Sequence, residues 1–247
     1  MIFSFDRPAI LRQCIQDLDV PDDCDIHLFQ DGAINPYSRK IKCRPPLVNK
    51  CVDGFMARFP MGMSHVAPAN LGVAMNHLRA YKYIFEEKKY DQCVFFDYDI
   101  TPTNVGALFT MCDRTRDIPD VMGADAVLNP YTYTYEAGGD DKVLLCDTSK
   151  YHIDFTTFAC CRDKYLTISK MYTEKITEFC GGVDYTQRDV AKITEYLGHE
   201  FGSQAWIRDR CFRDCGMTKK AIISKTMSRN GGDGDIVDDA EIIVTTD

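Results

Sequence analysis

The sequence predicts an α/β protein in which a mixed, mostly parallel central sheet is flanked by helices. Four short apolar runs, at residues 2–5, 26–29, 64–67 and 93–96, have the length of strands, and segments with helical spacing lie between them. This alternation is typical of a parallel, doubly wound sheet. No GxGxxG follows any run, so a dinucleotide-binding fold of the ordinary kind has no support.

The helical segments can be placed in order. Pro8 suits the first turn of a helix that follows the first strand, and a second helix is expected at 47–59. A stronger amphipathic pattern follows Asn70-Leu71-Gly72 and leads directly into the fourth strand. Its apolar residues are spaced four, three and four, at Ala74, Leu78, Tyr81 and Phe85.

Composition excludes several classes of protein. The chain has 247 residues and a formal net charge of -8, which argues against broad nucleic-acid binding. No apolar run has the length of a membrane span, and the first residues do not resemble a signal peptide. The 12 cysteines are scattered without paired CxxC spacing, so we expect mostly reduced thiols and a cytoplasmic location rather than a secreted disulfide framework.

Acidic residues stand at the ends of the predicted strands. Asp97 and Asp99 follow the fourth run, two positions apart, at the end of the sheet where α/β proteins bind ligands. A divalent cation that carries a phosphorylated substrate would explain such a pair. The simpler alternative is two solvated aspartates that open a loop. The first strand ends at Asp6-Arg7 and the second at Asp31, where the alternatives are a helix cap and a turn.

Four motifs resemble glycosyltransferases of the GT-A fold, which use nucleotide-diphosphate sugars. They are Phe5-Asp6-Arg7-Pro8, Phe29-Gln30-Asp31-Gly32, Asn70-Leu71-Gly72 and Asp97-Tyr98-Asp99. Their order is most similar to the N-acetylglucosaminyltransferase I group, and 223–227 also looks like that group's C-terminal segment. Tyr98 departs from the group, which has an acid there. The transmembrane anchor of the Golgi enzymes has no counterpart, as in the similar small glycosyltransferases of large algal viruses (chloroviruses), so the resemblance implies the host cytoplasm for a viral protein.

The resemblance implies roles for individual residues in binding a UDP-sugar donor. Arg7 and Asp31 would contact the uracil beside Phe5, and Asn76 or His77 would contact the base from the helix after Asn-Leu-Gly. For His77 the alternative is an ordinary histidine on a helix surface. Asp99 would bind Mn²⁺ or Mg²⁺ directly, and Asp97 would hold the ribose or a metal-bound water. The metal would stabilise the UDP leaving group.

The second half would bind a glycan or glycoprotein acceptor. Gly181 and Gly182 would let the backbone approach a ligand, and Asp184 matches the catalytic carboxylate of many inverting GT-A enzymes, where it acts as general base. The alternative is that Asp184 only caps a helix, with Asp189 as a second candidate. Tyr133 lies in an alternating Tyr131–Tyr135 segment, which would stack on a sugar or form a half-buried strand.

The C-terminal part divides in two. A basic stretch, with Lys219, Lys220, Lys225 and Arg229, either folds over the diphosphate or serves solubility. We predict one domain over 1–230, with a nucleotide-sugar half at 1–101 and an acceptor half at 102–230. Residues 231–247 read as an acidic flexible tail or linker, compatible with further domains in a longer polypeptide.

Two other functions stay open. The segment 95–101 also resembles the first motif of haloacid-dehalogenase-type phosphatases, in which Asp97 would be the nucleophile and Asp99 the general acid. That motif normally lies on the first strand of its fold, whereas three strands precede it here. A non-catalytic module that binds a nucleotide or carbohydrate is the third candidate.

Overall fold

The computed structural model describes residues 1–16, 18–98, 101–102, 105–126, 142–147, 157–181, 204–223, 227–228 and 241–244. Among these residues, nine strands form one sheet. They are β1 (Ile2–Ser4), β2 (His27–Gln30), β3 (Met63–Val66), β4 (Gln92–Asp97), β6 (Val121–Ala126), β7 (Lys142–Asp147), β8 (Thr157–Cys161), β9 (Lys219–Ile223) and β11 (Glu241–Val244). Two short strands, β5 (Thr101–Pro102) and β10 (Met227–Ser228), pair separately.

The helices of the described residues connect these strands. They are α1 (Pro8–Gln16), α2 (Pro45–Arg58), α3 (Gly72–Tyr81), a π-helical turn η1 (Lys82–Glu87), α4 (Val105–Arg114), α5 (Arg162–Cys180) and α7 (Gln204–Asp214). The longest of them, α5, carries charged residues throughout. None of the helices in the described part of the chain is apolar enough over a sufficient length to cross a bilayer.

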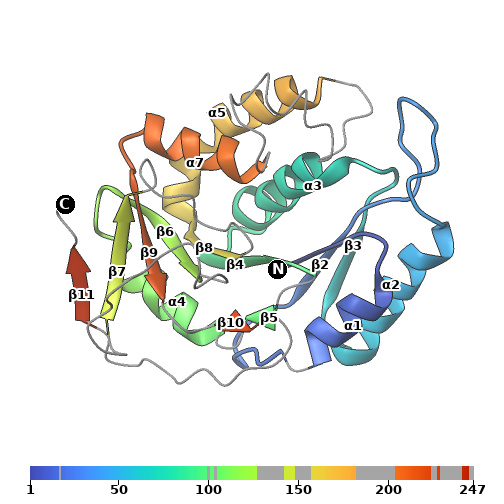
Figure 1. The fold of residues 1–247 in the computed structure, drawn as a ribbon, viewed down its shortest axis with the longest axis horizontal. Coiled ribbons are helices and arrows are strands. Elements are labelled where there is room, and N and C mark those ends of the chain that lie inside the picture. The colour runs from blue at the N-terminus through green and yellow to red at the C-terminus, as the bar shows by residue number, and fades with distance from the viewer. Residues whose placement is uncertain are drawn as a thin grey trace.

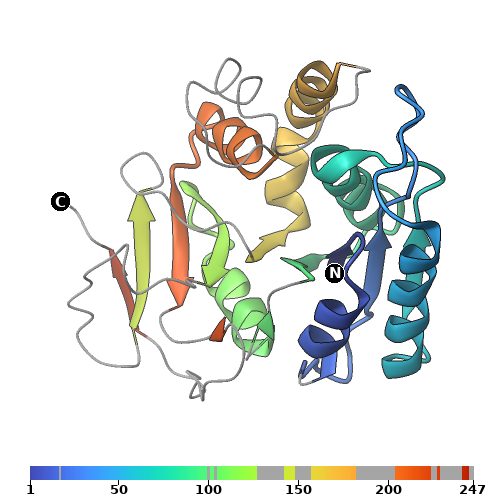
Figure 2. The same cartoon turned by 45° about the vertical axis from the view of Figure 1, so that its right-hand side comes forward.

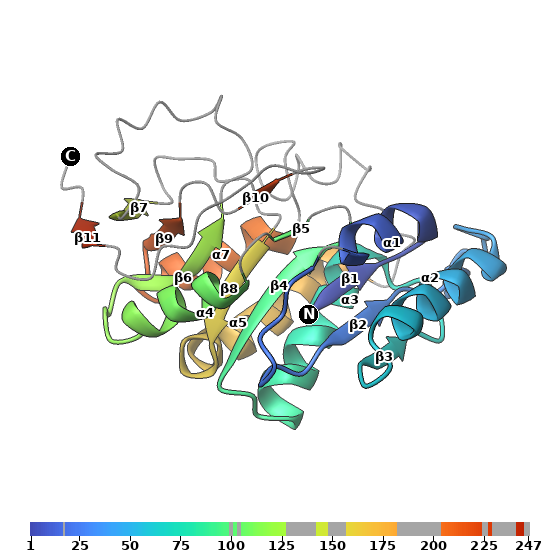
Figure 3. The same ribbon diagram turned by 90° about the horizontal axis from the view of Figure 1, so that it is seen from below.

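The sheet is mixed and mostly parallel, which confirms the predicted fold class. Its strand order is β11-β7-β9-β6-β8-β4-β1-β2-β3, and it can be followed from one side of Figure 3 to the other. Five of the eight neighbouring pairs are parallel, and the three antiparallel pairs are β4–β8, β6–β8 and β7–β9. The part formed by the first four strands, β3-β2-β1-β4, is entirely parallel.

Helices cover both faces of the sheet. Figure 1 shows α3, α5 and α7 on one face and α1, α2 and α4 on the other. Side chains alternate along the strands to fill the two cores: Phe3, Phe29 and Phe95 pack under the first set of helices, whereas Ile2 and Leu28 pack against the second. Such a two-sided core explains why these strands are short, continuous apolar runs.

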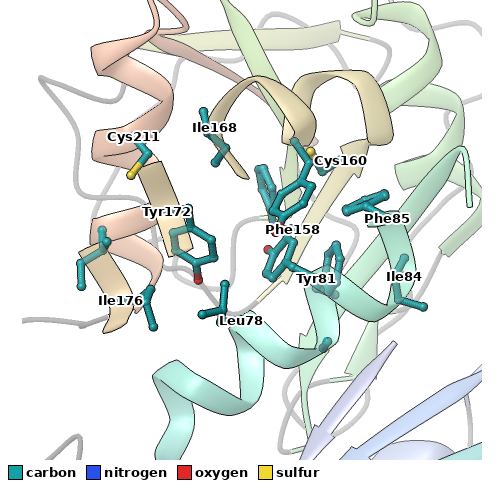
Figure 4. Packing of buried hydrophobic residues seen from close by; sticks show 14 of the residues in the cluster. Leu78, Tyr81, Ile84, Phe85, Phe158, Cys160, Ile168, Tyr172, Ile176 and Cys211 are labelled. Carbon is teal, nitrogen blue, oxygen red and sulfur yellow. The ribbon is translucent and has the colours of Figure 1, made fainter. Parts of the chain in front are cut away.

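An aromatic cluster fixes α3 to the sheet (Figure 4). The ring of Tyr81 lies 4.0 Å from that of Phe95 on β4 and 5.3 Å from that of Tyr165 on α5, and both pairs are stacked. Phe85, in the π-helical turn, stacks on Tyr165 at 5.1 Å. Burial of each ring contributes on the order of 1.5–3 kcal/mol. The helix that carries His77 is therefore held rigidly over β4.

The elements predicted from local pattern are confirmed, and one expectation is wrong. β1 to β4, α1, α2 and α3 lie where the apolar spacing placed them. Lys220, for which we expected either a place over the diphosphate or a role in solubility, is fully buried and lies 2.7 Å from Asp209 in the core, so neither alternative holds for it. Four residues of the predicted tail, Glu241–Val244, form β11 beside β7. The segment around Tyr133 and the helix predicted after Asp184 lie outside the described residues.

Candidate functional site

The ends of three neighbouring strands meet at one edge of the sheet. β1 leads into Phe5 and Arg7, β2 into Asp31, and β4 ends at Asp97. β2 pairs with one side of β1, and β3 pairs with the outer side of β2. After β3 the chain continues through α3 to β4, which pairs with the other side of β1. The strand order therefore reverses between β1 and β4. In open α/β sheets, the crevice outside the carboxyl ends of the strands at such a switch point is where ligands bind.

Asp31 is buried and organises the turn that begins α3. One carboxylate oxygen accepts hydrogen bonds from the backbone N–H groups of Gly32 and Leu71, each at 2.8 Å. The other accepts from the N–H of Gly72 at 3.0 Å and from the side-chain amide of Asn70 at 2.9 Å. Burial raises the pKa of Asp31 to about 6, and the backbone N–H groups oppose that shift. All four partners are donors, so the geometry suits the ionised carboxylate.

The prediction that Asp31 contacts a uracil remains a prediction, and its four hydrogen bonds show a different task. The carboxylate lies at the N-terminus of α3, where the helix dipole favours a negative charge. It also joins the end of β2 to the Asn70–Gly72 turn, which follows β3. Gly32 is required at this point because a Cβ atom there would lie 2.4 Å from the backbone carbon of Ala69.

Gln30 and Asn76 fix backbone around the same edge. The side-chain amide of Gln30 donates to the carbonyl of Phe5 at 2.5 Å and to that of Asp31 at 2.8 Å, which ties β1 to β2. Asn76 on α3 is buried and donates to the carbonyl of Phe29 at 3.2 Å. Asn76 therefore turns into the sheet. The sequence motif assigns no role to Gln30, although a polar side chain that closes an apolar strand is a sign of such a backbone contact.

His77 lies over the junction of β1 and β4. Its ring stacks on Phe3, with the centroids 3.5 Å apart and the planes at 13°. Its Nε2 atom lies 3.5 Å from Oδ1 of Asp97. His77 is buried, whereas about a third of the Asp97 side chain is exposed. The alternative that His77 is an ordinary helix-surface histidine is therefore wrong, and of the two neighbours, His77 rather than Asn76 reaches the predicted acidic residue.

Arg7 approaches the same edge from the loop after β1. Its side chain is exposed, and the guanidinium carbon lies 6.0 Å from the centre of the Tyr98 ring. This is the outer limit of a cation–π contact. Tyr98 follows Asp97 directly, so Arg7 faces the residue at which the sequence departs from the motif it resembles. Phe5, two residues before Arg7, is half-buried, and its backbone carbonyl accepts a hydrogen bond from the side chain of Gln30.

Only part of the predicted metal site can be located. Asp97 is described, and Asp99 lies outside the described residues. In the part of the chain that the structure describes, no three acidic, histidine or cysteine side chains come together as a metal site would require. The carboxylate of Asp97 is partly exposed at a strand end, and carboxylate oxygen is the ligand type that Mn²⁺ and Mg²⁺ prefer. Asp97 alone is thus a suitable ligand, and the metal site stays a prediction.

The predicted acceptor residues are mostly outside the described chain. Tyr133, Gly182 and Asp184 belong to that group. Gly181 is described and ends α5 in the left-handed conformation, with φ of 53°, where its N–H donates to the carbonyl of Thr177 at 2.9 Å. That is the ordinary position of a glycine that terminates a helix. Contact of Gly181 with a sugar remains a prediction.

A pocket of about 160 Å³ opens at the opposite edge of the sheet. Its lining includes Met1, Ile26, His27, Tyr90 and Gln92, which lie at or before the amino-terminal ends of β1, β2 and β4 or in the segment that leads into β4. The strand-end residues described above are not among its lining. The candidate site is therefore the polar carboxyl edge rather than this pocket.

Comparison with known proteins gives little beyond this geometry. No protein-family model matches the sequence, and no match is found among curated proteins. Among solved structures, the chain is similar to one described as the apo structure of the bifunctional glycosyltransferase WbbM, with 11% sequence identity and a TM-score of 0.36. The similarity covers 88% of this chain but 37% of that chain. A likeness this distant carries no argument about activity.

Proposed function

We propose that the chain is a metal-dependent glycosyltransferase that moves a sugar from a UDP-sugar to a hydroxyl group of a glycan or glycoprotein. The observation that supports this most is the approach of His77 to Asp97 at the β1/β4 switch point, 3.5 Å between Nε2 and Oδ1, with Arg7 on the same edge beside Tyr98. Arg7 and His77 can donate hydrogen bonds to anionic oxygens, and Asp97 can bind a cation. A ligand that brings both a diphosphate and a divalent cation satisfies all three groups.

Each residue has a role in donor binding under this proposal. Arg7 contacts the uracil or the diphosphate from the open side of the edge. His77, fixed by its stack on Phe3, holds Asp97 in place or donates to the ribose. Asp31 supports the turn that precedes α3, and its contact with the base is the residue-level proposal taken from the family resemblance. Asp97 and Asp99 hold Mn²⁺ or Mg²⁺, which supplies positive charge to the departing diphosphate.

Asp184 is the proposed general base of the transfer. Its carboxylate takes the proton of the acceptor hydroxyl while that oxygen bonds to the anomeric carbon and the bond from this carbon to UDP breaks. Asp184→Asn should therefore preserve UDP affinity and lower kcat by about 10² to 10⁴. A helix cap would tolerate the change, since Asn caps nearly as well. Near-wild-type kcat would refute the role, and retention of the anomeric configuration in the product, read by NMR, would refute the base mechanism.

Titration calorimetry with UDP, with and without Mn²⁺, tests the donor site directly. Asp97→Asn should abolish the Mn²⁺-dependent part of the affinity, because the amide is a poorer ligand for a hard cation and carries no charge. Asp53→Asn, on the exposed face of α2, is the matched control and should bind as wild type does. GDP and CMP in the same titration identify the base that the site accepts.

The rival functions separate in the same preparation. Hydrolysis of generic phosphomonoesters, abolished by Asp97→Asn, would favour the phosphatase over the transferase. Nucleotide binding without turnover of any UDP-sugar, with or without acceptors, would favour a binding module. Unchanged Mn²⁺-dependent UDP affinity in Asp97→Asn would remove Asp97 from the proposed metal site, and the same result in Asp99→Asn would remove the site itself.

A further inference from the structure

A basic segment interrupts an acidic protein. The formal net charge of the whole chain is -8, yet residues 32–52 contain three lysines and two arginines and no acidic residue. Four of these five cations fall within six positions, at Arg39, Lys40, Lys42 and Arg44. The segment connects β2 to α2 and continues into the first half of that helix. Its positive charge is therefore local and lies beside the candidate site.

Residues 33–43 fold into a hairpin of defined shape. Ile34 and Ile41 form an antiparallel bridge, and the N–H of Asn35 donates to the carbonyl of Lys40 at 2.9 Å. The side-chain oxygen of Asn35 accepts from the N–H groups of Tyr37 and Ser38 at 3.0 and 2.9 Å, which closes the turn. The hairpin is the blue loop that stands away from the body of the molecule in Figures 1 and 2.

The hairpin presents large apolar side chains together with cations. The exposed fractions are 43% for Ile34, 63% for Tyr37 and 68% for Ile41. Arg39 and Lys40 are exposed beside them, and within the described residues neither forms an ion pair with an acidic side chain. Arg39 has a φ of 59°, a left-handed conformation that a glycine or asparagine would adopt at lower cost. Exposed apolar side chains that are grouped beside cations are typical of an interaction site.

We propose that this hairpin docks the protein on a membrane surface that contains anionic lipids. Cations that flank apolar and tyrosine side chains match such a surface, because the headgroups attract the charges while the apolar groups enter the boundary with the acyl chains. A nucleic acid would use the cations but would leave Ile34 and Ile41 in water. The remainder of the chain carries a formal charge of -13, which an anionic surface repels, so the hairpin would face the membrane.

The hairpin adjoins the candidate site. Its first residue follows Gly32 directly, and the carbonyl of Ile34 accepts a hydrogen bond at 2.7 Å from the N–H of Asn70, in the turn that Asp31 holds. The hairpin and the candidate site therefore share one framework at the carboxyl edge of the sheet. Docking would place that edge near the bilayer. The proposal concerns binding alone, so it stands or falls independently of the transferase activity.

Vesicle flotation tests the proposal with the whole chain and no donor or acceptor. The protein should float with vesicles of phosphatidylcholine and phosphatidylserine, float poorly with phosphatidylcholine alone, and bind less as salt is raised. Each cation is worth about fivefold in partition, so the double variant Arg39→Gln with Lys40→Gln should lose about 25-fold. Ile41→Ser should lose about tenfold, because it removes an inserted apolar side chain.

Matched control variants test whether the binding depends on the hairpin itself or only on exposed cations and apolar side chains anywhere on the surface. Lys88→Gln with Lys89→Gln removes two exposed neighbouring cations near the opposite edge of the sheet, and Met61→Ser removes a side chain that is 94% exposed beyond the far end of α2. Both should bind vesicles as wild type does. Equal losses in the controls, equal flotation with both lipid mixtures, or binding to a single-stranded oligonucleotide without binding to vesicles would each overturn the proposal. Unchanged thermal unfolding of the variants establishes that binding, not folding, is being measured.

Discussion

At the scale of single residues, the candidate site depends on side chains that hold backbone as much as on those that can meet a ligand. Asp31 is the clearest case, because its two oxygens accept four hydrogen bonds from Gly32 and from residues 70–72. A carboxylate fits this arrangement, and an amide does not. In Asp31→Asn the amide NH₂ group would face two donors, so one or two buried N–H groups would lose their acceptor.

Asp31→Asn should therefore destabilise the fold by about 2–4 kcal/mol. Nucleotide affinity should fall together with stability, because the turn before α3 loses its support. Urea unfolding measures the first effect and titration with UDP the second. Asp53→Asn is the control for the loss of one negative charge at an exposed position. Wild-type stability in Asp31→Asn, combined with lost UDP affinity, would instead support direct contact between Asp31 and the base.

The sequence could identify which residues gather at the site but not which way they turn. Phe5, Arg7, Asp31 and Asp97 each follow a strand, and strand ends share an edge, so their proximity follows from the pattern. Asn76 and His77 are adjacent on one helix, and their directions differ by about 100°. The packing of α3 on β4 decides that His77 meets Asp97, and that packing involves residues remote in sequence, such as Tyr165.

At the scale of elements, a histidine pair joins the last two strands at one side of the sheet. Nδ1 of His27 on β2 lies 3.0 Å from Nε2 of His65 on β3, and Nε2 of His27 lies 3.2 Å from the hydroxyl of Tyr90. That hydroxyl in turn donates to Asp25 at 2.5 Å. Burial lowers the pKa of both histidines to about 4. The pair is therefore neutral at neutral pH and shares one hydrogen bond between the strands.

This pair makes stability depend on pH in a defined direction. The folded-state pKa values lie below the ordinary value of 6.5, so the unfolded chain takes up protons first as the pH falls. The contribution is complete above about pH 6.5 and is lost progressively towards about pH 4, with a slope of up to about 1.4 kcal/mol per pH unit for each histidine. His65→Phe should reduce this slope by about half, because it removes one of the two titrating histidines. Phe keeps the ring contacts with Phe29 and Tyr83, so the packing is preserved.

Urea unfolding at several pH values between about 7.5 and 5 measures the slope. Tyr83→Phe is the control, because it alters the same aromatic group without removing a histidine. A slope in His65→Phe equal to that of the wild type would show that other groups, such as carboxylates, dominate the acid sensitivity of the protein.

The helices and strands themselves are predictable where apolar residues recur along a segment at helical spacing or form a short continuous run. The first four strands and α1 to α3 follow from such local patterns. α5 was not predicted, although its buried residues Tyr165, Ile168, Tyr172, Ile176 and Phe179 repeat at three and four positions. α7 has a weaker pattern, and its inner side includes Arg208 and Asp209, which no rule based on apolar spacing would place in a core.

At the scale of the whole molecule, four buried charges join α7 to β6 and β9. Nζ of Lys220 lies 2.7 Å from Asp209 and 3.4 Å from Asp125, and the guanidinium of Arg208 lies 2.9 Å from Asp209. Arg208 also donates to the hydroxyl of Tyr81 on α3 at 3.0 Å. With both acids ionised, the charges balance. Such a network favours one arrangement of its elements, because any displacement leaves a charge without its partner.

The pKa values of the two acids of this network shift in opposite directions, although burial acts to raise both. It raises the pKa of Asp125 to about 7, and Lys220 and Arg208 offset only part of that shift. For Asp209, burial also acts to raise the pKa, but Lys220 and Arg208 outweigh it, so the pKa is lowered. A raised folded-state pKa means that the contribution of Asp125 to stability is complete below its ordinary value of 3.8 and is lost as the pH rises through about 7.

Lys220→Met should therefore cost more stability at high pH than at low pH. At about pH 8 it leaves two buried carboxylates facing an apolar side chain, and we expect a loss of about 3–5 kcal/mol. Near pH 5.5 Asp125 is protonated, so the loss should be smaller. Lys219→Met is the neighbouring control: Lys219 pairs with Asp120 at 2.9 Å, both side chains are partly exposed, and its loss should cost about 0–1 kcal/mol at either pH. Denaturant unfolding of both variants at the two pH values measures the difference. A loss in Lys220→Met that matches Lys219→Met, or that does not change with pH, would mean that the buried charges do not hold α7 against the sheet.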